Sequence, residues 1–75
     1  MAKQLRDQLY IEKVGKRIVE IRTRKNISQE KLQELSGFDI RQIGRIERAE
    51  NNPSISMIKR IADSLKVSMG DILDI

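Results

Sequence analysis

A chain of 75 residues is long enough for one small domain, and without cysteine or histidine neither a disulfide nor a His- or Cys-liganded metal can stabilise it. The net charge is +4, and the excess of basic residues lies in residues 1–48, where twelve Lys and Arg face seven Asp and Glu; residues 49–75 hold three against four. Because only Tyr10 and Phe38 are aromatic, few faces are available for stacking unpaired bases, and the basic part favours duplex over single-stranded nucleic acid.

The chain divides into an N-terminal extension, residues 1–9, and a domain, residues 10–75. The extension either frays or lengthens the first helix, and its MAKQLRDQLY start lacks the apolar core of a secretion signal. No apolar run approaches the ~18 residues of a membrane span. A helix from about Tyr10 to Lys25 is predicted from apolar residues spaced three and four apart: Ile11, Val14, Ile18 and Ile21.

Two short helices with a tight turn between them are predicted next. Ser28 is a good N-cap for the second helix, and Gly37 can adopt the left-handed conformation that ends it. Asp39 then begins the third helix, with Gln42 at the spacing of a capping box. Apolar residues from both helices and the turn can meet in one small core: Leu32, Phe38, Ile43 and Ile46.

A fourth helix follows the polar stretch that ends at Pro53, and a short fifth helix completes the chain. Ser54 or Ser56 caps the fourth helix, and Ser68 caps the fifth. Their apolar residues also keep helical spacing: Ile58, Ile61, Ala62, Leu65, Met69, Ile72 and Leu73. Since no segment shows sustained alternation, the prediction is a compact all-α domain of five helices.

The turn at Gly37 forces the second and third helices to cross steeply, which predicts a helix-turn-helix from about Ser28 to Arg48. The outer face of the third helix then carries one isoleucine, one glutamine and three arginines: Ile40, Gln42, Arg41, Arg45 and Arg48. A helix ~10–12 Å across fits the ~12 Å major groove of DNA, where arginine suits the O6 and N7 acceptors of guanine. The alternative is that these arginines only solvate a surface.

Seven short fragments stand in a characteristic order: VGKRI (14–18), IR (21–22), ISQEKL (27–32), SGF (36–38), IGRIER (43–48), NPS (52–54) and IADSLKV (61–67). In this order and spacing, residues 14–73 resemble the lambda-repressor-like, Cro or Xre-type helix-turn-helix family. The resemblance covers essentially the whole domain and implies a five-helix DNA-binding fold with the helix-turn-helix at helices two and three.

The resemblance also implies roles for individual residues. Four residues of the third helix correspond to the base-reading set: Ile40, Arg41, Gln42 and Arg45. Phosphate binding is implied for one residue that begins the second helix and for others after the third helix: Gln29, Arg48, Asn51, Asn52 and Ser54. Arg22 and Glu47 resemble the family's arginine–glutamate pair, which links the first helix to the end of the third.

Two positions depart from the family pattern. Gln33 replaces the alanine that is usual where the second and third helices approach, so its amide must swing outward or the crossing must widen. Ala49 replaces a glycine that ends the third helix, so we expect the left-handed cap to move to Asn51 or to be lost.

These features predict a sequence-specific regulator of transcription, a stand-alone repressor or controller-type protein, that binds a palindromic operator in double-stranded DNA as a homodimer. The expected dimer interface is Met69, Ile72 and Ile75, although core packing is the favoured interpretation for the inner edge of Ile72. We expect no ligand-sensing module to be attached to the domain. The expected location is the cytoplasm of a bacterium, chromosomal or phage-encoded, with no membrane association, no metal and no cofactor.

Two other functions remain open. The chain could be an antitoxin-type autorepressor with a toxin partner, or a protein-interaction module whose third helix binds another protein. An enzyme is not expected, because His and Cys are missing and the serines occupy cap positions, which explains them without catalysis.

Overall fold

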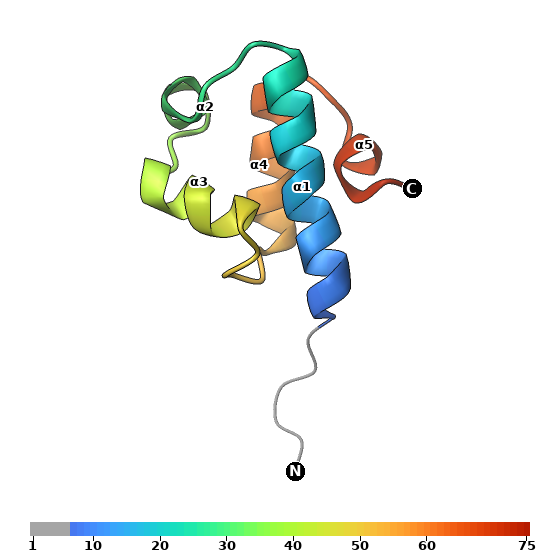
Figure 1. The fold of residues 1–75 in the computed structure, drawn as a ribbon. Coiled ribbons are helices and arrows are strands. Elements are labelled where there is room, and N and C mark those ends of the chain that lie inside the picture. The colour runs from blue at the N-terminus through green and yellow to red at the C-terminus, as the bar shows by residue number, and fades with distance from the viewer. Residues whose placement is uncertain (1–6) are drawn as a thin grey trace.

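A computed structural model describes residues 7–75, and Figure 1 shows how their helices are arranged. Five α-helices follow one another: α1 (Gln8–Arg24), α2 (Gln29–Ser36), α3 (Ile40–Glu47), α4 (Ile55–Leu65) and α5 (Met69–Leu73). No strand occurs in this part of the chain, so the all-α prediction is confirmed. No helix within it is long and apolar enough to cross a membrane.

The beginning of α1 refines the predicted domain boundary. The helix begins at Gln8, and the Asp7 side chain caps it by accepting a hydrogen bond from the Tyr10 backbone N–H. Residues 7–9 therefore belong to the domain, while the rest of the predicted extension, residues 1–6, lies outside the described residues.

Each later helix begins at a side chain that accepts a hydrogen bond from the first turn, since those backbone N–H groups have no partner inside the helix. Ser28, Ser54 and Ser68 do this for α2, α4 and α5, so Ser54 rather than Ser56 caps α4. The capping box predicted for Asp39 and Gln42 is wrong, because the Asp39 carboxylate accepts from the Arg41 N–H instead.

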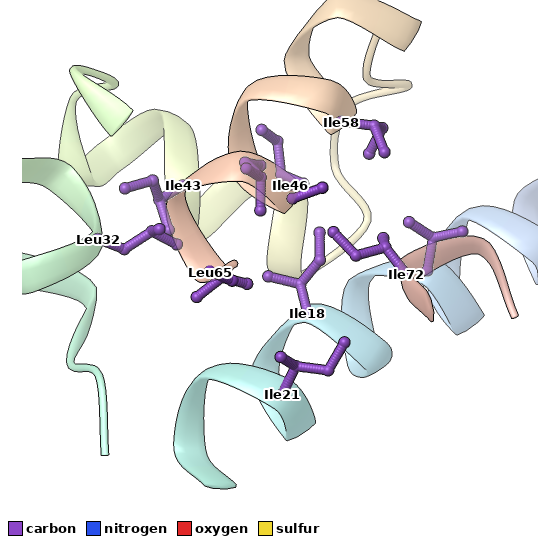
Figure 2. Close-up of a cluster of buried hydrophobic side chains, with 11 residues drawn as sticks. Ile18, Ile21, Leu32, Ile43, Ile46, Ile58, Leu65 and Ile72 are labelled. Carbon is purple, nitrogen blue, oxygen red and sulfur yellow. The ribbon is translucent and has the colours of Figure 1, made fainter. Parts of the chain in front are cut away.

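The core lies among the five helices: α1 packs against α3 and α5, and α4 packs against α2 and α5. In Figure 1 the α2–α3 pair lies to one side of α1 and α5 to the other. Figure 2 shows its apolar side chains pointing toward one another from all five helices. The largest fully buried ones are Ile18, Leu32, Ile43, Ile46, Ile61, Leu65 and Ile72. Because burying one such side chain stabilises a fold by about 1.5–3 kcal/mol, these contacts hold the helices in place.

One residue predicted for the dimer interface belongs to this core. Ile72 is 0% exposed and packs in the cluster that includes Ile18 and Leu65, so it offers no surface to a second copy. Met69 is half-buried and Ile75 is 91% exposed, so these two remain available. The fifth helix therefore has one face in the core and another at the surface.

Candidate nucleic-acid interface

The turn between α2 and α3 presents α3 at the surface. Gly37 has φ +84°, the left-handed conformation that glycine adopts without strain, and its N–H donates to the Gln33 carbonyl at 2.9 Å. Only residues 37–39 separate the two helices. Leu32 and Ile43 are both fully buried, so each helix turns one apolar face inward and α3 is left with an outer face.

The residues expected to read bases lie on that outer face. Arg41 and Arg45 are exposed, while Ile40 and Gln42 are half-buried beside them. The Arg41 side chain is 81% exposed, and its guanidinium lies 3.6 Å from the Asp39 carboxylate. The structure thus brings the four predicted residues together on one helix, with the guanidinium groups directed to solvent.

Asp39 adds a local charge at the N-terminus of α3. Its carboxylate accepts from the Arg41 N–H at 2.8 Å, and this hydrogen bond, together with the Arg41 guanidinium, lowers the pKa of Asp39 below its ordinary value of 3.8. The carboxylate is therefore ionised at neutral pH and stabilises the first turn of the helix whose side chains face outward.

The residues expected to bind phosphate gather at the opposite end of α3. The Gln29 side chain, at the N-terminus of α2, donates to the Glu47 carboxylate at 2.8 Å, which brings that N-terminus next to the last residue of α3. Arg48 directly follows and pairs with Glu50 at 2.8 Å. The loop after it holds Asn51, Asn52 and Ser54, of which Ser54 also caps α4.

Arg22 and Glu47, the two residues expected to pair, are joined by two hydrogen bonds. Arg22 Nε donates to Glu47 Oε2 at 2.8 Å and Nη2 donates to Oε1 at 3.1 Å. The side chains are only 14% and 5% exposed. Since Gln29 donates to the same carboxylate and Arg22 also donates to the Ile27 carbonyl, this cluster connects α1, α2 and the end of α3.

Gly15 brings α1 into close contact with the same end of α3, a role that sequence reasoning missed. A Cβ at this position would lie 2.6 Å from the Glu47 carbonyl oxygen and 2.8 Å from that of Ile46. No side chain fits there. The available signal was a glycine inside an otherwise regular amphipathic helix, where it costs ~1 kcal/mol relative to alanine and so needs a packing reason.

The two departures from the family pattern are accommodated differently. Ala49 itself adopts the left-handed conformation, with φ +62°, so the expectation that the cap moves to Asn51 or disappears is wrong. Gln33 is exposed, as expected for an outward-turned amide, and its side chain also makes a hydrogen bond to α3. Its Oε1 accepts a hydrogen bond from the Ile40 N–H at 2.7 Å.

An apolar groove of about 130 Å³ lies away from the arginines of α3, between the start of α1, the start of α4 and α5. Its walls include Tyr10, Ile55, Met69 and Leu73, and Ile55 is 80% exposed at its edge. Asn52 and Pro53 line the same groove, so the loop that holds candidate phosphate-binding residues is also one of its walls.

A tight-turned helix pair with an outward-facing, arginine-bearing second helix defines the helix-turn-helix class of DNA-binding proteins. The family model described as Helix-turn-helix (HTH_3) matches residues 18–72. The chain therefore belongs to this Cro/Xre-type family, as the resemblance implied, and to its class of DNA-binding transcription regulators. No curated protein sequence gives a significant match.

Solved structures of regulators share the fold. The restriction-modification controller protein C.AhdI from Aeromonas hydrophila is 37% identical with a TM-score of 0.80, over 83% of this chain and 94% of that one. The controller protein C.Esp1396I is 31% identical with a TM-score of 0.82, over 91% and 92% of the two chains. The hypothetical transcription factor NHTF from Neisseria is 26% identical with a TM-score of 0.81, over 97% and 85%.

Proposed function

We propose that this protein is a sequence-specific regulator of the controller type, which binds a palindromic operator as a homodimer with α3 in the major groove. The observation that carries the proposal is the outer face of α3, where Arg41 and Arg45 are exposed on a helix whose other face is buried. The likeness to two restriction-modification controller proteins over most of both chains supports the controller type.

In this proposal the side chains of α3 contact different bases. Arg41 and Arg45 donate to the O6 and N7 acceptors of guanine, which is the contact that arginine makes most often in the major groove. Gln42 suits adenine, and Ile40 suits the methyl group of thymine. Gln29, Arg48 and the loop that contains Asn51, Asn52 and Ser54 bind phosphates and set the position of the helix along the duplex.

A second copy of the chain is proposed to cover the apolar groove. One domain of this size reads too few base pairs to discriminate strongly, whereas two linked copies read half-sites about one helical turn apart, ~34 Å. Met69 and Ile75 remain in the proposed interface, and Tyr10, Ile55 and Leu73 join it in place of Ile72. Because the groove borders Asn52, the second copy sits beside the DNA-facing loop.

Selection of bound duplexes from a random pool tests the proposal directly. We expect enrichment of one palindromic sequence and a loss of about 1–3 kcal/mol of specific binding when Arg41 or Arg45 is replaced by Ala, with relaxed preference at one position per half-site. Replacing Asn52 with Ala should weaken binding to all duplexes equally, since phosphates carry no sequence. A pool that shows no enrichment contradicts sequence-specific binding.

Sedimentation across a dilution series tests the dimer. The Ile55→Asp variant places a charge at the edge of the groove without touching the core, since the side chain is 80% exposed. We expect weaker self-association and weaker operator binding, because two half-sites are no longer read by one linked unit. Leu35→Asp is the matched control: Leu35 is 47% exposed on α2, away from the groove, and should leave self-association unchanged. A wild-type protein that remains monomeric and still binds one palindrome tightly contradicts the dimer.

A further inference from the structure

Gln33 takes part in ending one helix and in beginning the next. Its backbone carbonyl accepts the Gly37 N–H at 2.9 Å, which closes α2. Its side-chain Oε1 accepts the Ile40 N–H at 2.7 Å, which begins α3 seven residues later. The two carbonyl groups of a single residue therefore span the turn between the two helices.

The Ile40 N–H needs a partner from outside its own helix. The first backbone N–H groups of a helix have no intrahelical acceptor, and a side chain or water must satisfy them. Asp39, the N-cap of α3, uses its carboxylate on the Arg41 N–H. The Gln33 side-chain carbonyl is the acceptor for the Ile40 N–H. Because Gln33 lies on α2 and Ile40 begins α3, this hydrogen bond joins the two helices.

The other polar contacts of the turn hold its middle, not the start of α3. The Ser36 hydroxyl accepts the Phe38 N–H at 3.1 Å, and Arg60 of α4 donates to the Ser36 carbonyl at 3.2 Å. Both contacts involve only residues 36–38 of the turn, so neither reaches α3. Within the described residues, the hydrogen bond accepted by Gln33 is the one that joins a side chain of α2 to the first residue of α3.

We propose that Gln33 is a positioning residue for base reading: through the Ile40 N–H it sets where the N-terminus of α3 lies against α2. The proposal rests on the function proposed above. Ile40 and Arg41 are the first two residues of α3, so a shift of this end displaces them directly. Hydrogen bonds to base edges are directional, and a recognition site tolerates only ~0.5 Å and ~10–20° of misplacement. Loss of the Gln33 acceptor therefore lowers discrimination between sequences more than it lowers affinity for DNA in general.

Three substitutions of Gln33 distinguish the effect of losing the hydrogen-bond acceptor from the effects of changing the length or the charge of the side chain. Gln33→Met keeps the length but has no carbonyl, Gln33→Ala removes the side chain, and Gln33→Glu keeps an acceptor oxygen. Because Gln33 is exposed, none of them removes core packing. Glu34→Met is the matched control, since Glu34 is exposed on the same turn and its side chain bonds only to Lys31 within the described residues.

The first measurement uses the protein without DNA. Hydrogen exchange of the Ile40 amide, followed by NMR, should be about 3- to 10-fold faster in Gln33→Met and Gln33→Ala than in the wild type or Gln33→Glu. Residual dipolar couplings should show a changed orientation of α3 relative to α2 in the same two variants. The Gly37 amide, bonded to the Gln33 backbone, should be unaffected in all of them. Unchanged exchange and unchanged couplings in Gln33→Met overturn the proposal.

The second measurement compares binding to the selected duplex with binding to a scrambled duplex. Gln33→Met should reduce the ratio of the two affinities by about 3- to 10-fold. Gln33→Glu should weaken binding to both duplexes through its charge and keep the ratio, and Glu34→Met should keep it too. An unchanged ratio in Gln33→Met, with α3 reoriented, overturns the link to base reading. A wild type without any preferred duplex overturns the proposed function instead, and the DNA-free measurement still decides whether Gln33 positions α3.

Discussion

The two ends of α3 are held in different ways. At the C-terminal end, α1 contributes buried contacts: Gly15 lies against the backbone carbonyls of Ile46 and Glu47, and Arg22 pairs with a Glu47 side chain that is 5% exposed. At the N-terminal end, the contacts are exposed hydrogen bonds from Gln33 and Asp39.

The proposed function gives a reason for this difference. An end that enters a groove of DNA cannot be covered by other helices, and here the Gln33 side chain of α2 and the Asp39 side chain of the turn hold it from the edge. Exposed hydrogen bonds and ion pairs compete with water and contribute little each, whereas contacts in a desolvated cluster are costly to break. Buried contacts therefore hold the end of α3 that meets α1, and exposed hydrogen bonds hold the end that is proposed to meet the bases.

The largest expected effect comes from breaking the buried pair. Glu47→Ala leaves the Arg22 guanidinium largely buried without its carboxylate and removes the partner of Gln29, so we expect a loss of about 3–5 kcal/mol in the free energy of unfolding. Urea denaturation measures it. Glu50→Ala is the control: its pair with Arg48 has the same 2.8 Å distance but is exposed, and its removal should cost far less. Equal losses would mean that burial does not distinguish the two pairs.

The next effect comes from the contact of α1 with the α3 carbonyls. Gly15→Ala places a methyl group against backbone that cannot move alone, so we expect a net loss of about 1–3 kcal/mol in the free energy of unfolding, even though alanine favours helix. In the Gly44→Ala control the three atoms nearest the new Cβ all belong to the Arg48 side chain, which is exposed and can turn away, and stability should be unchanged or higher. A stable Gly15→Ala protein would show that α1 is free to move away from α3.

A smaller effect at the N-terminal end is expected to depend on pH. The pKa of Asp39 is lowered in the folded protein, so its contribution to stability is present above the ordinary value of 3.8 and is lost as the pH falls through the lower folded value. Asp39→Asn keeps an acceptor but no charge. We expect the wild type to be slightly more stable than Asp39→Asn at pH 7. The two urea midpoints should begin to approach each other as the pH falls below 3.8 and should coincide below the lowered pKa of the folded protein. A difference that persists in acid would contradict this origin.

The smallest effect is expected at Ala49, just beyond the buried end. Ala49→Gly relieves a left-handed conformation that costs ~1–2 kcal/mol, but it removes a buried methyl group worth ~0.8 kcal/mol. The free energy of unfolding should therefore change by no more than about 1 kcal/mol. A large loss would indicate that the methyl group, in addition to Gly15 and Glu47, anchors the end of α3.

Much of the fold could be predicted because its signals are local. The apolar spacing of Ile11 to Ile21 predicts α1 to within two residues of its start, since a helix repeats every 3.6 residues. Ser28 and Gly37 predict the bounds of α2, because caps depend on groups only a few residues away. The order of the fragments, from VGKRI to IADSLKV, was enough to predict the family.

What the sequence could not determine depends on residues that are distant along the chain. Ile72 has the same spacing whether it packs in the core or faces a partner, and only the packing of α5 against α1 and α4 buries it completely. The Gln29 amide donates to Glu47 at 2.8 Å because the fold places the end of α3 beside the start of α2, a contact that spacing along the chain does not reveal. Gln33 reaches Ile40 only because the turn at Gly37 returns α3 toward α2. Composition and spacing determine which segments become helices. Side-chain partners depend on how the helices are arranged in the tertiary structure, because the partners are distant along the chain.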